Sequence, residues 1–332
     1  MNGSSEHWSP LLVTGANGFL GSEIIRRMLP AKIQVCATDR GAESVVYGVE
    51  YYSADILDPA SLLPFLKGGA TLIHTAGLAH IFDKSRADWA SFKNVNEVGT
   101  ANVARAAAKV GVRHFVLISS VSVYGGSRNG GVEDAVCHPQ GPYAESKYQA
   151  EQRAIEIGKQ SGMAISILRL ATLYGEGDPG NVARLMRKID RGYFIWIGNG
   201  SNRKSLLHRE DAARACLAVV SRPAASVNIY NVSASPCSMR DVVEGLAGAL
   251  GKRTPRRGIP APLAREISGL LSILPMRRLQ SLGATVQKLL ADDVYDGRKF
   301  ARTFNFQVHV KLAEGLRREV GWYRREQAKR GT

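Results

Sequence analysis

Residues 14–21 read TGANGFLG, and they stand between a short apolar run and a helical pattern. In a strand–turn–helix unit, Gly15 permits a tight turn, Gly18 lets the backbone approach a pyrophosphate, and Gly21 lets the helix lie close to the strand. The first turn of such a helix offers free N–H groups and the positive end of its dipole to phosphate. The stretch therefore predicts a dinucleotide site, although its GxxGxxG spacing differs from the common GxGxxG.

The next predicted strand ends in Asp39. A carboxylate at that position can accept hydrogen bonds from both hydroxyls of an adenosine ribose, and it repels a 2′-phosphate. This favours NAD as the cofactor. Arg40 follows directly and is able to bind a 2′-phosphate, so NADP remains an alternative.

Short apolar runs alternate with helical patterns around this motif. The predicted strands are 11–14, 33–38, 71–74, 114–118, 164–169 and 194–197, and the predicted helices are 18–29, 59–66, 94–110, 143–160 and one from Val182 onward. Strands that alternate with helices form a parallel sheet with helices on both faces. The predicted fold class is α/β, a doubly wound parallel sheet with a smaller C-terminal mixed α/β domain.

A chain of 332 residues exceeds the usual size of a single core, roughly 250–300 residues. We expect a dinucleotide-binding domain over 9–175, with a return segment at about 203–232, and a substrate-binding domain over 176–330. After Leu173 the pattern becomes less regular. The two domains are expected to be interleaved, because in such folds the chain crosses back and forth between them.

A second motif, YAESK, places Tyr143 and Lys147 at the start of a predicted helix. Residues four apart lie on the same helical face. A nearby ammonium favours a phenolate and so lowers the pKa of a tyrosine. Tyr143 can then act as general base or acid toward an alcohol during hydride transfer.

A third motif, LISSVSVYG at 117–125, ends the strand before that helix. Ser120 stands where its hydroxyl can hydrogen-bond the same substrate oxygen as Tyr143. Any one of these motifs occurs by chance. Their combination is improbable by chance: a glycine turn is followed by an acid at a strand end, a serine at a strand end and a helix with Tyr and Lys. This order indicates redox chemistry at an alcohol carbon.

The composition is that of a globular protein, with an unusual formal charge of +15. That charge fits nucleic acid, an anionic membrane surface or an acidic small substrate, and does not choose among them. The four cysteines are scattered without a CxxC pair, which predicts no disulfide framework, no metal site and a reducing, cytoplasmic location. The N-terminal residues lack the pattern of a signal peptide.

Other conspicuous residues have ordinary explanations. The tryptophans Trp8, Trp89, Trp196 and Trp322 are predicted to be packing residues rather than base-stacking platforms. His74 and His80 lack partners at metal-ligand spacing and are predicted to be core or loop residues. The basic runs at 253–257 and 324–330 are predicted to be solvated surface.

The chain resembles the extended short-chain dehydrogenase/reductase family, in particular its nucleotide-sugar epimerase and reductase branch with a Rossmann fold. The resemblance covers roughly residues 10 to 325. It rests on TGANGFLG, HTAG at 74–77, NEVGT at 96–100, LISSVSVYG, PYAESK and the stretch 198–215 that contains His208 and Asp211.

The resemblance implies that Ser120, Tyr143 and Lys147 are catalytic, that Asp55 binds the adenine edge and that Asn96 supports the wall of the active site. The implied cofactor-binding residues are Gly15, Asn17, Gly18, Phe19, Leu20, Gly21, Asp39, Arg40, Asp55, Ile56, Ala76, Gly77, Asn96, Ser119, Tyr143 and Lys147. The implied substrate-binding residues are Ser120, Ser122, Thr172, Asn181, Arg203 and Lys204. Members of the family commonly form homodimers through the two long helices, here 94–110 and 143–160.

Relatives that dehydrate sugars carry an Asp-Glu pair after the catalytic hydroxyl, where this chain has Val121 and Ser122. Dehydration is therefore not expected. The expected function is an NAD-dependent epimerase of a nucleotide sugar, UDP-linked by the family's majority, that oxidises and reduces carbon 4. A one-way 4-ketosugar reductase is the first alternative, and a steroid-like alcohol stays open as substrate.

Two further alternatives concern the positive charge. One alternative is a non-catalytic binding or sensor module, but such a module has no need of the whole Ser/Tyr/Lys set. Peripheral association with an anionic membrane through 263–278 is permitted by the mixture of apolar and basic residues there, with a lid helix over the substrate as the other interpretation. No nucleic-acid partner and no stable membrane insertion are expected.

Overall fold

The computed structural model describes residues 10–31, 33–79, 89–126, 131–222, 225–273 and 277–330. The chain divides into two compact units. Unit 1 comprises Met1–Thr172, Arg209–Val232 and Asp296–Val308, and unit 2 comprises Leu173–His208, Ser233–Tyr295 and His309–Thr332.

Unit 1 is built on a seven-stranded sheet whose strand order is β11-β6-β5-β4-β1-β2-β3. Every neighbouring pair is parallel. The strands are β1 (Leu11–Thr14), β2 (Val35–Asp39), β3 (Glu50–Ser53), β4 (Thr71–His74), β5 (His114–Ser120), β6 (Ala164–Leu170) and β11 (Val227–Val232). The predicted doubly wound parallel sheet is confirmed.

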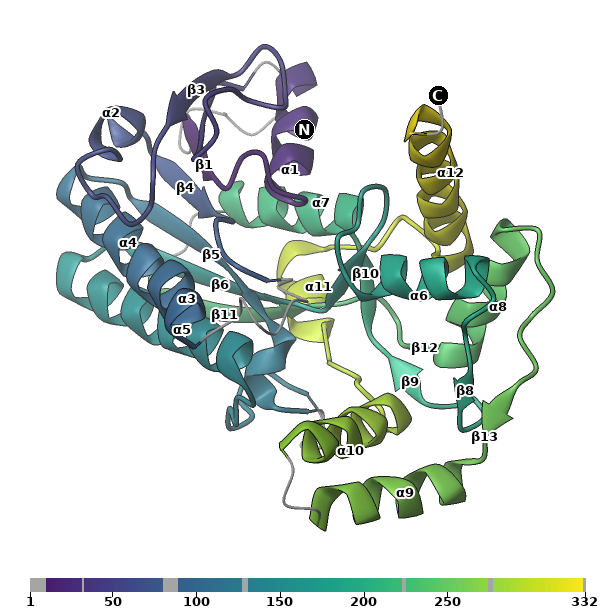
Figure 1. Ribbon diagram of the computed structural model, residues 1–332. Coiled ribbons are helices and arrows are strands. Elements are labelled where there is room, and N and C mark those ends of the chain that lie inside the picture. The colour runs from purple at the N-terminus through teal and green to yellow at the C-terminus, as the bar shows by residue number, and fades with distance from the viewer. Residues whose placement is uncertain are drawn as a thin grey trace. The chain divides into compact units, whose positions relative to one another are not determined.

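Helices cover both faces of this sheet. In Figure 1, α4 (Gly99–Lys109) and α5 (Pro142–Ser161) lie together on one face, and α1 (Gly21–Met28) and α7 (Arg209–Val220) lie together on the other. The remaining helices of unit 1 are α2 (Leu63–Leu66), α3 (Trp89–Phe92) and α11 (Arg298–Phe304). Strands β1 and β4 are buried along their whole length, because a parallel sheet between two helical layers has no solvent face.

The order of the strands reverses between β1 and β4, since the chain passes from β1 outward to β2 and later returns to β4 on the other side. In open α/β sheets, ligands bind outside the carboxyl ends of the strands at such a reversal. The glycine turn, Asp39, His74 and Ser120 all stand at or just after the carboxyl ends of their strands. The topology thus gathers the predicted motifs at one edge of the sheet.

Several predicted boundaries were wrong. Helix α1 begins at Gly21 instead of residue 18, because residues 15–20 form the turn. Of the helix predicted at 59–66, only Leu63–Leu66 is helical. The helix predicted at 94–110 begins as a π-helix at Lys93–Val98 and is α-helical over Gly99–Lys109. Strands β3 and β11 were not predicted as strands.

Unit 2 has a mixed α/β structure. Its elements are β7 (Thr172–Tyr174), α6 (Asn181–Asp190), β8 (Trp196–Ile197), β9 (Arg203–Lys204), β10 (Leu206–His208), β12 (Cys237–Ser238), α8 (Met239–Ala249), β13 (Gly258–Ile259), α9 (Ala261–Ile273), α10 (Arg277–Leu290) and α12 (Leu312–Arg330). Side chains of α6, α8 and α12 form its core, among them Met186, Leu246 and Val320. Helix α8 starts with a capping box in which Ser238 and Asp241 exchange hydrogen bonds.

Among the described residues, no helix is both long enough and apolar enough to pass through a membrane.

Glu319 on α12 is a carboxyl group inside the core of unit 2, with only 1% of its surface exposed. Burial and the charge of Asp178 raise its pKa to about 9, against a hydrogen bond from the backbone of Gly175 that lowers it. The unfolded chain ionises the same group near its ordinary pKa of 4.5. The stability that protonated Glu319 contributes is therefore complete below that pH and is lost as the pH rises toward 9.

Glu319→Gln is expected to remove this pH dependence, because an amide cannot ionise. The free energy of unfolding should then fall less steeply from about pH 5 to about pH 9, by at most about 1.4 kcal/mol per pH unit. Urea unfolding at several pH values measures the slope. A variant whose slope equals that of the parent would show that Glu319 keeps its ordinary pKa in the folded chain.

Candidate active site

The glycine turn after β1 is built as the sequence predicts. Gly15 has a φ of +68°, a conformation that favours glycine, and it accepts a hydrogen bond from the N–H of Gly18 at 3.0 Å. A Cβ on Gly21 would lie 2.1 Å from the Gly15 carbonyl oxygen, and one on Gly15 would lie 2.6 Å from the nitrogen of Ala76. The absence of side chains lets the turn lie against both α1 and the end of β4, so Gly15, Gly18 and Gly21 shape a cradle in which backbone is exposed to a ligand.

Asp39 at the end of β2 is fixed by backbone groups. Its carboxylate accepts hydrogen bonds from the N–H groups of Asn17 at 3.0 Å and Arg40 at 2.7 Å. These bonds use one lone pair on each oxygen, which leaves capacity to accept ribose hydroxyls. The side chain of Arg40 is exposed beside it.

The side chain of Asn17 has a structural task. Its amide nitrogen donates to the carbonyl of Glu43 at 2.9 Å, and its amide oxygen accepts from the N–H of Val45 at 2.9 Å. Asn17 thus ties the glycine turn to the loop after β2. The N–H of Asn17 donates to Asp39, whereas its side chain bonds the backbone of the loop at Glu43 and Val45.

Asp55 and Ile56 follow β3. The Asp55 carboxylate accepts a hydrogen bond from the N–H of Leu57 at 2.9 Å and so closes its own turn. Ile56 is buried, and a Cβ on Gly99 would lie 2.5 Å from its Cδ1 atom. Ile56 is therefore a core residue that locks α4 against this turn, and it presents backbone rather than side chain to a ligand.

The segment after β4 is held by Asn96. Its side chain accepts from the N–H of Leu78 at 2.8 Å and donates to the carbonyl of Leu78 at 3.0 Å and to the Ser146 hydroxyl at 2.9 Å. A Cβ on Gly77 would lie 3.0 Å from the Asn96 side-chain oxygen. The π-helical turn at Lys93–Val98 carries Asn96 into this position, where it joins the β4 loop to α5.

His74 is a buried core histidine. It hydrogen-bonds Thr14 at 2.7 Å and Thr100 at 3.0 Å, and burial together with the charge of Lys147 lowers its pKa to about 3. This neutral role agrees with the prediction. His80 and Trp8 lie outside the described residues.

Ser120, Tyr143 and Lys147 come together at the carboxyl end of β5. Ser120 is the last residue of β5, and Tyr143 is the second residue of α5. The edge of the Tyr143 ring meets Phe92, with ring centroids 6.1 Å apart. The ammonium group of Lys147, which is 8% exposed, donates to the carbonyl of Ile118 at 2.5 Å.

The ionisation of the phenol differs from the expectation in one respect. Burial raises the pKa of Tyr143, and a hydrogen bond with the Ser120 side chain lowers it. The group that favours the phenolate here is Ser120, because the ammonium of Lys147 is engaged by the Ile118 carbonyl. Burial also lowers the pKa of Lys147 to about 8, against the charge of Glu151, which raises it.

Glu151 is one turn beyond Lys147 on α5, and it was not among the predicted site residues. It is fully buried, accepts from the Ser119 hydroxyl at 2.5 Å and pairs with Arg169, with 2.7 Å between Arg169 Nη2 and Glu151 Oε2. Arg169 donates to the Tyr124 hydroxyl, which donates to the Asn231 side chain at 2.8 Å. The network joins α5 to β5, β6 and β11. Its sequence signal was the four-residue spacing from Lys147 to Glu151.

Besides Ser120, the predicted substrate residues of unit 1 are Ser122 and Thr172. The backbone N–H of Ser122 donates to the Ser120 hydroxyl at 3.2 Å, and the Ser122 hydroxyl is buried with no hydrogen-bond partner among the residues that the structure describes. Thr172 begins β7 and is half-buried.

The predicted substrate residues of unit 2 are placed differently from one another. Asn181 is exposed at the first position of α6. Arg203 and Lys204 are neighbours on β9, so their side chains point to opposite faces. Lys204 donates to the carbonyls of Lys288 at 3.3 Å and Ala291 at 3.0 Å. The side chain of Arg203 is exposed, and its backbone N–H donates to the Asp292 carboxylate at 2.7 Å.

His208 on β10 is buried in unit 2. Its Nε2 atom lies 3.3 Å from Glu176, which Arg318 also binds at 2.6 Å. Burial raises the pKa of Glu176, but hydrogen bonds from His208, from its own backbone and from Arg318 outweigh burial and lower it to about 2. The residue that matches the late motif, His208, is thus in contact with a carboxylate inside unit 2.

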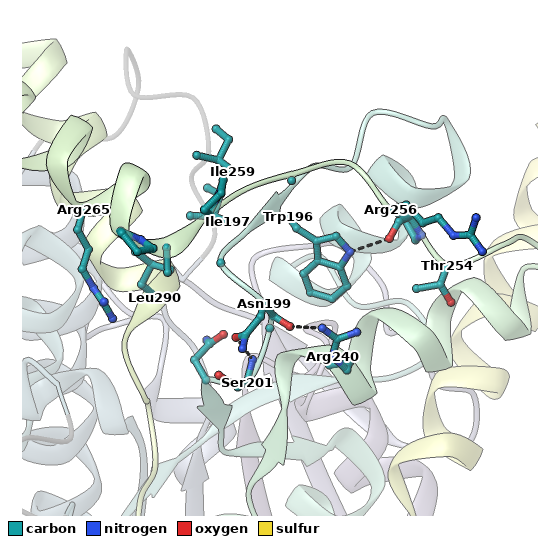
Figure 2. Close-up of a pocket in the computed structure, with 18 of the residues that line it drawn as sticks. Trp196, Ile197, Asn199, Ser201, Arg240, Thr254, Arg256, Ile259, Arg265 and Leu290 are labelled. Atoms are coloured by element: carbon teal, nitrogen blue, oxygen red, sulfur yellow. Dashed lines mark hydrogen bonds between the residues drawn. The ribbon is translucent and has the colours of Figure 1, made fainter.

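Unit 2 contains a pocket of about 1200 Å³. It is lined by the β8 segment with Trp196, by the loop before α9 and by three arginines, Arg240, Arg256 and Arg265. Figure 2 shows Trp196 between these parts, with its indole N–H bonded to the carbonyl of Pro255 at 2.7 Å and the Arg240 guanidinium 5.6 Å from its ring. Trp196 therefore serves as a core residue and as a wall of the pocket. No local pattern predicts the pocket, because β8 and β13 are some 60 residues apart and are joined only in the fold.

Comparison with known proteins agrees with this arrangement. The model of the NAD dependent epimerase/dehydratase family matches residues 11–233. UDP-glucose 4-epimerase of Vibrio cholerae is 30% identical over 75% of this chain and 78% of its own length. N-acetyl-alpha-D-glucosaminyl-diphospho-ditrans,octacis-undecaprenol 4-epimerase of Escherichia coli O157:H7 is 28% identical over 93% of this chain and 94% of its own.

The solved structure of MoeE5 in complex with UDP-glucose and NAD covers 96% of this chain and 99% of its own, with a TM-score of 0.77 and 25% identity. The family match spans the sheet, the glycine turn and the Ser/Tyr/Lys group described above. The chain is therefore an enzyme of the NAD dependent epimerase/dehydratase family.

Proposed function

We propose that the chain is a nucleotide-sugar 4-epimerase with a UDP-linked substrate. One observation carries the proposal: Ser120, Tyr143 and Lys147 lie together at the carboxyl ends of the strands, the same edge of the sheet that carries the glycine turn. Two 4-epimerases among the relatives support the reaction, and the UDP-glucose 4-epimerase together with a neighbour solved with UDP-glucose supports the substrate class.

The residues divide the work of removing a proton from the sugar hydroxyl. Tyr143 accepts that proton, and Ser120, which already hydrogen-bonds the phenol, shares the substrate oxygen. The buried ammonium of Lys147, which donates to the Ile118 carbonyl at the end of β5, is assigned to the ribose of the nicotinamide. NAD, when bound, supplies the hydride acceptor, and the glycine cradle and Asp39 are the residues that fit it. After the keto-sugar has rotated in the site and presents the other face of carbon 4, Tyr143 returns the proton to the oxygen.

The pocket of unit 2 is suited to the charged part of the substrate. The pocket is lined by Arg240, Arg256 and Arg265. One guanidinium group can donate two parallel hydrogen bonds to the oxygens of a phosphate. Of the two predicted cations on β9, the Lys204 ammonium is already bound by the carbonyls of Lys288 and Ala291, so the exposed Arg203 is the remaining candidate to bind the substrate. We assign the nucleoside diphosphate to this pocket.

Asp39→Asn is expected to weaken NAD binding about 10–100-fold, because hydrogen bonds to a carboxylate contribute about 1.5–3 kcal/mol and an amide lacks the charge. Calorimetric titration of the purified protein with NAD and NADP measures this. The variant should lose affinity for NAD and gain relative affinity for NADP, since the carboxylate no longer repels a 2′-phosphate. Equal NAD affinity in parent and variant would remove Asp39 from the cofactor site.

A 4-ketosugar reductase is the alternative reaction for the same three residues. An epimerase regenerates NAD in each cycle and therefore keeps it bound, whereas a reductase exchanges its cofactor. NAD that survives purification favours the epimerase. Consumption of added NADH or NADPH with a keto-sugar favours the reductase. We further propose a homodimer that pairs α4 and α5 of two chains.

The test of the reaction is product analysis. UDP-, GDP- and dTDP-sugars are incubated with the protein and NAD, and the configuration at carbon 4 is read by NMR. Accumulation of the 4-epimer with a UDP-sugar supports the proposal. The E. coli relative suggests one more substrate for the panel, a sugar on undecaprenyl diphosphate. Turnover of that compound alone would replace the UDP-sugar by a lipid-linked one.

A further inference from the structure

Helix α9 carries an exposed apolar stripe. Leu263, Ile267 and Leu270 follow one another at spacings of four and three residues, and they are 48%, 39% and 67% exposed. Residues at these spacings share one face of a helix. Ala264 and Ser268 are buried on another face, where the Ser268 hydroxyl donates to the carbonyl of Gly283 on α10 at 2.9 Å. The stripe therefore faces away from the partner helix.

Among the side chains that the structure describes, the other large apolar ones that unit 2 exposes lie in neighbouring segments. They are Tyr193, Ile195, Ile259 and Leu289. The pairing of β8 with β13 brings the segment after Ile195 to the segment that leads into α9. Figure 2 shows Ile197 and Ile259 next to each other beside α9. Exposed apolar surface in unit 2 is thus concentrated around α9.

Positive charge is concentrated in the same part of the chain. Unit 2 holds 22 of the 44 lysines and arginines but 11 of the 29 acidic residues, so it carries +11 of the net +15. Residues 252–290 contain eight basic residues and one acidic residue, Glu266. Arg256, Arg257 and Arg265 are exposed. An apolar helical face within a strongly basic segment is typical of helices that lie in the interface of anionic membranes.

We propose that α9 binds the surface of an anionic lipid bilayer, with Leu263, Ile267 and Leu270 inserted among the headgroups. Basic residues of 252–290 that do not line the arginine pocket, such as the exposed Arg253 and Arg257, face lipid phosphates. Nucleic acid fits less well, because it offers nothing to the apolar stripe. A second copy of the same surface also fits less well, because residues 252–290 carry a net charge of +7 in each copy and the two segments would repel each other. Helix α9 has 13 residues, too few to span a bilayer, so the association is peripheral.

The experiment is co-sedimentation of the full chain with vesicles. Vesicles of phosphatidylcholine with one quarter phosphatidylglycerol are compared with pure phosphatidylcholine. The parent should bind the anionic vesicles at least about tenfold more tightly, and high salt should weaken the binding. The triple variant Leu263→Ser, Ile267→Ser, Leu270→Ser should lose at least about tenfold in affinity. The matched control is Leu63→Ser with Val110→Ser, two exposed apolar residues of unit 1, and it should bind like the parent.

Two results would overturn the proposal: no binding of anionic vesicles by the parent, or equal binding by parent and triple variant. A different result would assign the stripe to a second copy of the chain: the parent does not bind vesicles, and light scattering gives the triple variant a different oligomeric state from the parent. The proposal does not depend on the reaction. A Tyr143→Phe protein should bind vesicles like the parent, so failure of the catalytic assignment and failure of the membrane assignment are distinguishable.

Discussion

A Tyr143→Phe enzyme is expected to turn over about 10²–10⁴-fold more slowly than its parent, the range that a positioned general acid or base contributes. The substitution removes one oxygen from a half-buried ring and leaves its edge contact with Phe92 in place. The fold and the NAD affinity should therefore be unchanged. Initial rates with a UDP-sugar that the parent epimerises, at saturating substrate and NAD, measure the loss.

Tyr148→Phe is the matched control, since Tyr148 lies on the same helix and has a comparable partial burial. Its rate should equal that of the parent. The assignment of Tyr143 would be refuted by a Tyr143→Phe enzyme with the parent's rate. Loss of rate in both variants would point instead to a general disturbance of α5.

The sheet was predictable where its strands are uniformly apolar. Strands β1 and β4 begin and end where the sequence places them, because each is buried on both faces and bounded by a turn. The edge strand β3 reads EYYS and is half exposed, so it shows no apolar run. Strand β11 contains the polar residue Asn231, whose buried side chain hydrogen-bonds the Tyr124 hydroxyl and the Gly131 carbonyl. A local pattern cannot show such a partner.

The site was predictable to the extent that single motifs place it. Gly15, Ser120 and Tyr143 are recognisable because each requires a particular residue at a turn, a strand end or a helix start. The task of the Asn17 side chain and the capture of Lys204 by α10 depend on segments distant in sequence. The same holds for the pocket around Trp196, whose walls are joined by the pairing of β8 and β13.

Glu151→Gln is expected to lower the free energy of unfolding by about 3–5 kcal/mol, because it leaves the Arg169 guanidinium buried without its counter-charge. Urea unfolding measures the change. Glu156→Gln is the matched control on the same helix. Its side chain is 55% exposed and lies 3.6 Å from Arg153, so the change should be at most about 1 kcal/mol. Equal stability of the Glu151→Gln and Glu156→Gln proteins would contradict the role assigned to the buried pair.

The same substitution separates a structural role of Glu151 from its effect on Lys147. Burial lowers the pKa of Lys147 to about 8 and the charge of Glu151 opposes that shift, so the neutral Gln should lower the pKa further. The ammonium would then lose its proton at a lower pH. The rate of the folded variant, divided by that of the parent, should therefore fall as the pH rises from about 6.5 to about 8.5. A ratio independent of pH would mean that Glu151 acts only by holding α5 to the sheet, since a purely structural defect does not titrate with Lys147.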